Sequence, residues 1–120
     1  MANILVVEDD PLLSLDISEA LEDEGYNVIA VANADEAIKV LESRNDIRTI
    51  FTDIDLPGLM DGLKLADAVR DRWPPVHIIV TTGMRAPHRD EMPANSMFIA
   101  KPYRSAEVLK AVRSFENALP

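Results

Sequence analysis

Two apolar segments of the chain are followed closely by carboxylates. Residues 4–7 read Ile-Leu-Val-Val and precede Glu8 and Asp9, and the mainly apolar run 47–51 comes just before Asp53. Carboxylates that meet at close range repel one another and stay ionised only when a cation neutralises them. Mg²⁺ suits such oxygen ligands and leaves room for a phosphoryl oxygen, and a carboxylate beside it can attack phosphorus. These residues therefore form a candidate Mg²⁺ site at which a carboxylate could act as a nucleophile toward phosphorus.

Hydroxyl groups and an ammonium group follow two further apolar segments. Thr81 and Thr82 come after the run 78–80, and Lys101 comes after the run 97–100. A lysine and a threonine hydroxyl can bind phosphoryl oxygens as these gain charge during transfer. Because the chain lacks a GxxxxGK[ST] phosphate loop, we expect no nucleotide site.

Strands and helices must alternate to bring these side chains together. Apolar runs predict five strands, at residues 3–8, 28–31, 47–53, 76–81 and 97–100. Apolar residues at helical spacing predict helices after the first three strands and after the last. This alternation predicts a (βα)₅ flavodoxin-like, doubly wound α/β fold with five parallel strands in the order 2-1-3-4-5. In such a sheet the carboxyl ends of the strands form the edge where ligands bind.

Particular residues mark where helices begin or are interrupted. Asp10 and Asn33 are expected helix N-caps, and Ser105 is expected to cap the last helix. Pro87 and Pro93 enclose only five residues, so the fourth helix should be short or irregular.

Length, charge and hydropathy limit the class of protein. With 120 residues and 48% hydrophobic content, the chain is expected to form one soluble domain, residues 1–120. A net charge of −9 argues against direct binding to nucleic acid, and no apolar run is long enough to span a membrane. The N-terminus lacks the pattern of a secretion signal, so we expect a cytoplasmic protein.

The motifs at these strand ends resemble those of the receiver (response-regulator, CheY-like) domain of bacterial two-component systems. Residues 6–11 resemble the acidic-pair motif of the family, and Asp53 with Pro57 and Gly62 resembles its phosphoacceptor loop. Lys101-Pro102 resembles the lysine–proline motif. The resemblance covers essentially the whole chain.

The resemblance implies roles for the acidic residues. Asp53 would accept a phosphoryl group from a phosphohistidine on a sensor histidine kinase or a histidine phosphotransfer protein. Asp9, Asp53 and the backbone carbonyl of Asp55 would bind Mg²⁺, with Glu8 acting through water. The protein would catalyse only its own phosphorylation and dephosphorylation and would not be an enzyme in the ordinary sense.

The resemblance also implies a switch. Lys101 would form a salt bridge to the phosphate, next to a cis peptide bond before Pro102. Thr81 would move toward the phosphoryl group, and Phe98, three residues before the lysine, would turn inward. We take Thr81 as the switch hydroxyl because its spacing to Lys101 is less compressed, and Thr82 is the alternative.

Two connections depart from the common pattern of the family. The loop 57–62 is longer than usual, and the segment 81–101 is shorter. Together with the Thr-Thr-Gly ending of the fourth predicted strand, these features resemble a subgroup common in α-proteobacteria, in which Thr-Gly or Thr-Ser-Gly replaces the usual ending. The chain resembles a stand-alone receiver of that type. Because the short fourth helix alters the usual dimer face, we expect a monomer or a weak, phosphorylation-dependent dimer. Because no output domain is expected within these 120 residues, the chain is expected to be either a stand-alone receiver or a receiver cut from a longer chain. A downstream protein partner is expected to read the switch.

Two other functions fit parts of the sequence. Residues 51–56 resemble the nucleophile motif of haloacid-dehalogenase-like phosphatases, with Asp53 as nucleophile and Asp55 as general acid. That family has another residue type at the position of Leu56 and places the motif near the N-terminus. The second alternative is a receiver-like interaction module that is never phosphorylated, although such modules usually lose the acid pair, the aspartate or the lysine.

Overall fold

One parallel sheet forms the centre of the molecule. The computed structural model describes residues 3–84, 86–94 and 96–117. Its strands are β1 (Asn3–Val7), β2 (Asn27–Val31), β3 (Ile47–Asp53), β4 (His77–Thr82) and β5 (Ser96–Ala100). They lie in the order β2-β1-β3-β4-β5, and every neighbouring pair is parallel. The predicted fold class and strand order are therefore confirmed.

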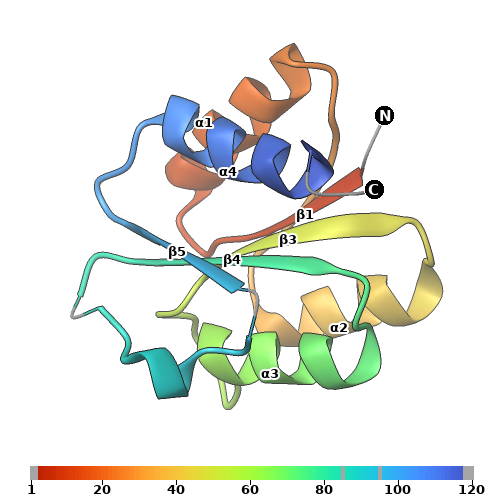
Figure 1. Ribbon diagram of the computed structural model, residues 1–120, viewed down its shortest axis with the longest axis vertical. Helices are drawn as coiled ribbons and strands as arrows, with labels where there is room; N and C mark the ends of the chain where they lie inside the picture. Colours follow the sequence, from red (N-terminus) through yellow and green to blue (C-terminus); the bar gives the residue numbers. More distant parts are fainter. Residues whose placement is uncertain (1–2, 85, 95, 118–120) are drawn as a thin grey trace.

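Helices cover both faces of this sheet. The helices are α1 (Pro11–Asp23), α2 (Ala34–Ser43), α3 (Gly62–Arg72) and α4 (Ser105–Asn117), with a 3₁₀ turn η1 (Arg89–Glu91). Figure 1 shows α1 and α4 on one face and α2 and α3 on the other. Between β4 and β5, η1 is the only helical element in the described residues, which confirms the prediction of a short or irregular fourth helix.

Alternate residues of each strand pack into two separate apolar layers. Ile50 of β3 packs into the layer beneath α2 and α3, together with Leu65 and Val69. Its neighbour Phe51 packs into the layer beneath α1 and α4, together with Val108. This alternation follows from the two-residue period of a strand, and it explains why the central strands carry apolar residues at successive positions.

The predicted caps of α1 and α2 are present. The Asp10 carboxylate accepts a hydrogen bond from the Leu12 amide at 3.0 Å, ahead of Pro11 at the first helical position. The Asn33 side chain accepts one from the Glu36 amide at 2.9 Å. Both side chains satisfy amides that have no partner within the helix.

The predicted cap of the last helix was wrong by one position. Ser105 is the first residue of α4 rather than the residue before it. The Glu107 carboxylate instead reaches back and accepts a hydrogen bond from the Arg104 amide at 3.1 Å.

In the part of the chain that the structure describes, no helix is long and apolar enough to cross a membrane.

Candidate functional site

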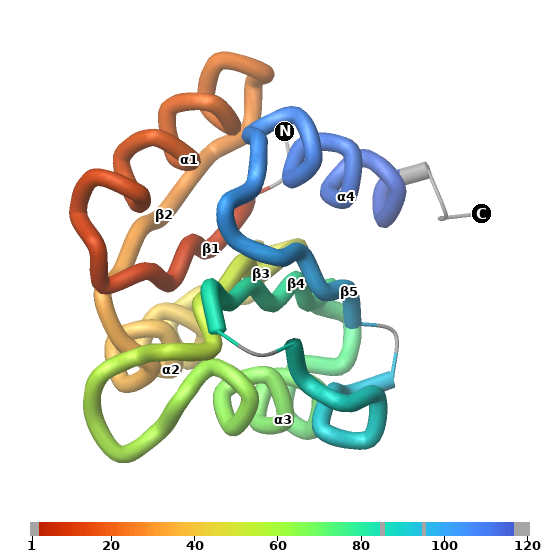
Figure 2. Tube along the Cα trace, turned by 90° about the vertical axis from the view of Figure 1, so that its left-hand side faces the viewer, coloured from red at the N-terminus to blue at the C-terminus, as the bar shows by residue number. Residues whose placement is uncertain are grey.

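The side chain of Lys101 joins two strand ends at the carboxyl edge of the sheet. Its Nζ donates hydrogen bonds to Glu8 Oε1 at 3.0 Å and to Asp53 Oδ2 at 2.7 Å. The Glu8 and Asp53 side chains are only 4% and 5% exposed, so both ion pairs are largely shielded from water. Figure 2 looks onto this edge and shows the chain leaving β1, β3, β4 and β5 around one centre.

Three carboxylates surround this contact. Glu8, Asp9 and Asp53 each offer an oxygen within 4.8 Å of the others, and Asp9 is exposed to solvent. One lysine cannot neutralise three carboxylates, so the cluster keeps a net negative charge. Hard oxygen ligands in this number fit the donor set of a small divalent cation such as Mg²⁺.

The surroundings alter the pKa values of the paired groups. Burial raises the pKa of Glu8, although hydrogen bonds from the Asp10 amide and from Lys101 oppose this shift. Burial acts to lower the pKa of Lys101, but hydrogen bonds to Asp53 and Glu8 outweigh it and raise that pKa above its ordinary value. Lys101 therefore remains a cation throughout the physiological pH range.

The backbone of the loop after β3 packs tightly against the start of α3. The Gly62 amide donates a hydrogen bond to the Ile54 carbonyl at 2.9 Å. A Cβ atom at position 62 would lie 2.1 Å from the Asp53 carbonyl oxygen, so only glycine fits there. Asp53 Oδ1 also accepts a hydrogen bond from the Asp55 amide at 2.9 Å, which orients the carboxylate within its loop.

The two threonines at the end of β4 point in different directions. Thr81 pairs with Asp53 in the strand register, and its buried hydroxyl has no hydrogen-bond partner within the described residues. The Thr82 hydroxyl donates to the Asp55 carboxylate. Strand β4 extends one residue beyond its predicted end because the Lys101 amide bonds to the Thr82 carbonyl at 2.9 Å.

Thr82 shares a face of the sheet with Phe98. Ile78 and Val80 pack beneath α2 and α3, and strand alternation places Thr82 on that side as well. Phe98 is half-buried against the same layer.

The peptide bond from Lys101 to Pro102 is cis.

Sequence reasoning missed two features of this edge. The hydrogen bond between Thr82 and Asp55 joins residues far apart in the chain, and no local pattern indicates it. Tyr103 lies beside the acidic cluster, where burial raises its pKa to about 12 and its ring meets Phe51 edge-on at 5.5 Å. The position of Tyr103, two residues after Lys101, was the sequence feature that could have indicated its place near the acidic cluster.

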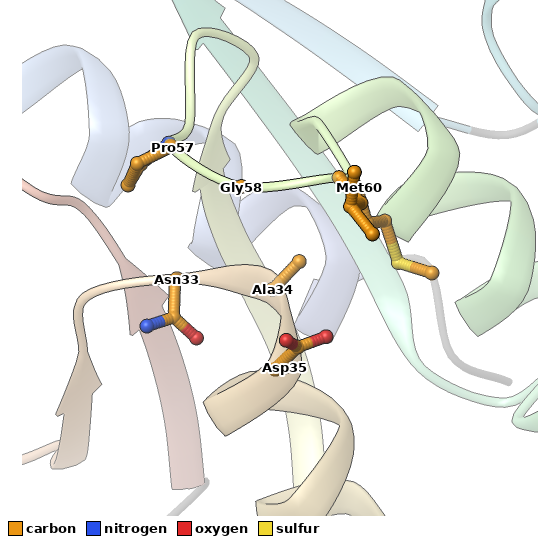
Figure 3. Close-up of a pocket in the computed structure, with 7 residues that line it drawn as sticks. Asn33, Ala34, Asp35, Pro57, Gly58 and Met60 are labelled. Atoms are coloured by element: carbon orange, nitrogen blue, oxygen red, sulfur yellow. The ribbon is translucent and has the colours of Figure 1, made fainter.

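A small hollow lies between α2 and the loop after β3. It has a volume of about 160 Å³ and separates the start of α2 from the loop after β3 (Figure 3). Its lining residues are Asn33, Ala34, Asp35, Pro57, Gly58, Leu59 and Met60. None of the three clustered carboxylates lines it, so it is separate from the acidic site.

Comparison with known proteins identifies the class that this site belongs to. The family model of the response regulator receiver domain matches residues 4–113, and the chain therefore belongs to this family. The phyllosphere-induced regulator PhyR of Methylorubrum extorquens is 35% identical over 109 residues, which cover 88% of this chain and 40% of PhyR. The chain thus spans about two fifths of that relative's length.

Solved structures of receiver proteins superpose closely on this chain. A response regulator receiver protein from Sinorhizobium medicae gives a TM-score of 0.91 at 31% identity, covering 98% of this chain and 95% of that one. The response regulator TrrA of Thermotoga maritima, solved with Mg²⁺ and BeF, gives 0.85 at 29% identity and covers 96% and 99%. TrrA has also been solved in complex with the histidine kinase ThkA, with a TM-score of 0.85, 28% identity and coverage of 96% and 98%.

Proposed function

We propose that this chain is a phosphoacceptor receiver in which Asp53 takes a phosphoryl group from a protein phosphohistidine. The observation that carries this proposal is the shared contact of Lys101 with Glu8 and Asp53 inside a cluster of three carboxylates. The donor is a sensor histidine kinase or a histidine phosphotransfer protein. The structure of the similar TrrA with a histidine kinase supports this class of partner.

The residues of the site divide the chemistry among them. An Asp53 carboxylate oxygen attacks phosphorus, an O–P bond forms, and the N–P bond breaks with its electron pair left on the histidine nitrogen. Lys101 keeps its proton and stabilises the charge that develops on the phosphoryl oxygens. The Asp55 amide holds Asp53 Oδ1, so the carboxylate is oriented before the donor arrives.

Mg²⁺ is the cofactor that the donor set favours. Glu8, Asp9 and Asp53 are the side chains that would hold it, with the Asp55 backbone carbonyl as a further oxygen ligand. When bound, Mg²⁺ supplies positive charge that offsets repulsion between the carboxylates and the incoming phosphoryl group. The similar TrrA was solved with this ion and BeF.

We assign the switch hydroxyl to Thr82 rather than Thr81. Thr82 lies on the same face as Phe98, so one hydroxyl can couple the phosphoryl group to the aromatic ring. Both threonines are buried, but the Thr82 hydroxyl already bonds to an exposed carboxylate of the loop after β3, whereas the Thr81 hydroxyl has no hydrogen-bond partner within the described residues. The expected result is a change at the surface near Phe98, which a downstream protein partner reads.

The edge around Asp53 has features of a protein-docking surface. Large apolar side chains are strongly exposed there on α1 and on the loops after β3 and β4: Leu12, Leu15, Leu59 and Met84. A phosphohistidine donor that docks on this edge would cover them.

A cytoplasmic location and a monomeric or weakly dimeric state are parts of the same proposal.

Phosphorylation by a small-molecule donor tests this function. Wild type and Asp53→Asn are incubated with acetyl phosphate, with and without Mg²⁺, and intact mass is measured. We expect a Mg²⁺-dependent gain of one phosphoryl group in the wild type, no gain in Asp53→Asn, and normal labelling of the exposed control Asp67→Asn. No gain in the wild type, under conditions that label another receiver, would favour the phosphorylation-independent interaction module.

A further inference from the structure

One hydrogen bond ties the end of β4 to the loop after β3. The Thr82 hydroxyl donates a hydrogen bond to Asp55 Oδ2, and the two residues are 27 positions apart in the sequence. The hydroxyl oxygen of Thr82 accepts a hydrogen bond from the Met84 amide at 3.0 Å. A threonine hydroxyl has a single proton to donate, so the Asp55 carboxylate occupies the whole donor capacity of Thr82.

Both partners adjoin the phosphoacceptor. The Asp55 amide bonds to Asp53 Oδ1 at 2.9 Å. The Thr82 carbonyl accepts a hydrogen bond from the Lys101 amide at 2.9 Å, and Lys101 Nζ lies 2.7 Å from Asp53 Oδ2. Thr82 itself is 2% exposed, so its hydroxyl has little access to water as an alternative partner.

We propose that the Asp55 carboxylate competes with a phosphoryl group on Asp53 for the proton of the Thr82 hydroxyl. Asp55 is then a positioning residue that sets how readily the domain switches, an inference that rests on the proposed function. A phosphoryl oxygen and a carboxylate oxygen are both anionic acceptors, so switching exchanges one charge-assisted hydrogen bond for another. Removing the carboxylate ends the competition and favours the switched state.

The affinity for beryllofluoride, a phosphoryl analogue, measures this competition. Titration calorimetry at saturating Mg²⁺ compares wild type, Asp55→Ala, Thr82→Val and the double variant. Loss of Asp55 also removes a nearby negative charge, which strengthens anion binding whether or not Thr82 has its hydroxyl. Only the competition depends on that hydroxyl, so the double variant separates the two effects.

We expect Asp55→Ala to tighten beryllofluoride binding on the order of tenfold in the wild-type background, the size expected for one hydrogen bond to a charged group. In the Thr82→Val background the gain should be much smaller, whereas in the control Thr81→Val it should match the wild type. An equal gain in the Thr82→Val background would show a charge effect alone and overturn the proposal, as would no gain in the wild-type background.

A second measurement needs neither Mg²⁺ nor a phosphoryl analogue. Urea unfolding of the same four proteins should show that the effects of Asp55→Ala and Thr82→Val on the free energy of unfolding are not additive. Each substitution removes the same hydrogen bond, so the second removes nothing further of it. Additive effects would contradict the contact on which the competition depends. If the contact is present but wild type does not bind beryllofluoride, the proposed function fails and the competition fails with it.

Discussion

The strand β3 passes through two regions of opposite character. Ile50 and Phe51 lie in the apolar layers and are 0% and 2% exposed, and Asp53 at the strand end is 4% exposed among charged groups. Burial of the first two side chains stabilises the fold, because each removes apolar surface from water. Burial of the third stabilises little, because desolvation of the ion pair offsets most of its attraction. The apolar layers therefore supply most of the stability of the fold, whereas the charged edge contributes little to it.

A core substitution should have the largest effect on stability. Leu65 lies on the buried face of α3 and is 0% exposed, and Leu65→Ala removes apolar contact and leaves a cavity. We expect the free energy of unfolding to fall by about 2–5 kcal/mol, measured by urea denaturation. The matched control is Leu59→Ala, which removes the same atoms from a fully exposed side chain and should change stability by less than about 0.5 kcal/mol.

Lys101→Ala should be the most destabilising change at the charged edge. It leaves Glu8 and Asp53 buried without their shared cation, and we expect a loss of about 3 kcal/mol without Mg²⁺. Because a divalent cation can replace the missing positive charge, Mg²⁺ should restore more stability to this variant than to the wild type. Equal stabilisation of both proteins by Mg²⁺ would argue that the ion does not bind among these carboxylates.

Gly62→Ala tests the junction between the two regions. The added Cβ would lie 2.1 Å from the Asp53 carbonyl oxygen, so the backbone must shift. We expect a loss of about 1–3 kcal/mol of stability together with slower acetyl-phosphate labelling, since the shift displaces the phosphoacceptor. Gly58→Ala is the control for the loop, because a Cβ there meets no atom within 4 Å, although its φ of +97° still adds some strain.

The smallest expected effect is a pH dependence from His77 at the far end of β4. Its ring stacks on Phe115 at 4.4 Å, and burial, followed by the positive charge of Arg48, lowers its pKa from 6.5. The unfolded chain then binds more protons than the folded chain between the folded pKa and 6.5. Stability should therefore decrease as pH falls through this window and level off below it.

The variant His77→Phe isolates that dependence, because it keeps the stacking and removes the titrating group. Urea unfolding between neutral and mildly acidic pH should show a smaller decrease of stability for the variant than for the wild type. If stability depended on pH in the same way in both proteins, the pKa of His77 would be the same in the folded and unfolded states.

The sequence predicted the parts of the molecule that depend on local patterns. Mainly apolar runs indicated the five strands, and their alternation with helices indicated the strand order. Because parallel strands end at one edge, the meeting of Glu8, Asp53 and Lys101 was predictable without any distance information.

Two features of the structure could not be predicted from the sequence. The Lys101 amide extends β4 to Thr82, and the Thr82 hydroxyl bonds to Asp55 across 27 residues of sequence, a contact that no local pattern indicates. Ser105 looked like a cap by residue type, but the Glu107 side chain satisfies the Arg104 amide instead. The Arg104–Glu107 contact spans only three residues, so in that place two local capping patterns competed and the sequence did not rank them.

The connection between β4 and β5 contains a three-residue turn, where the other crossovers contain helices of ten or more residues. A long helix forms and melts cooperatively, because its first turn is unfavourable and each later residue adds a hydrogen bond. One turn has no such cooperativity, so η1 can open and reclose without melting a longer element. If the partner of the proposed function binds beside Phe98, we expect it to contact this single turn rather than the side of a long helix.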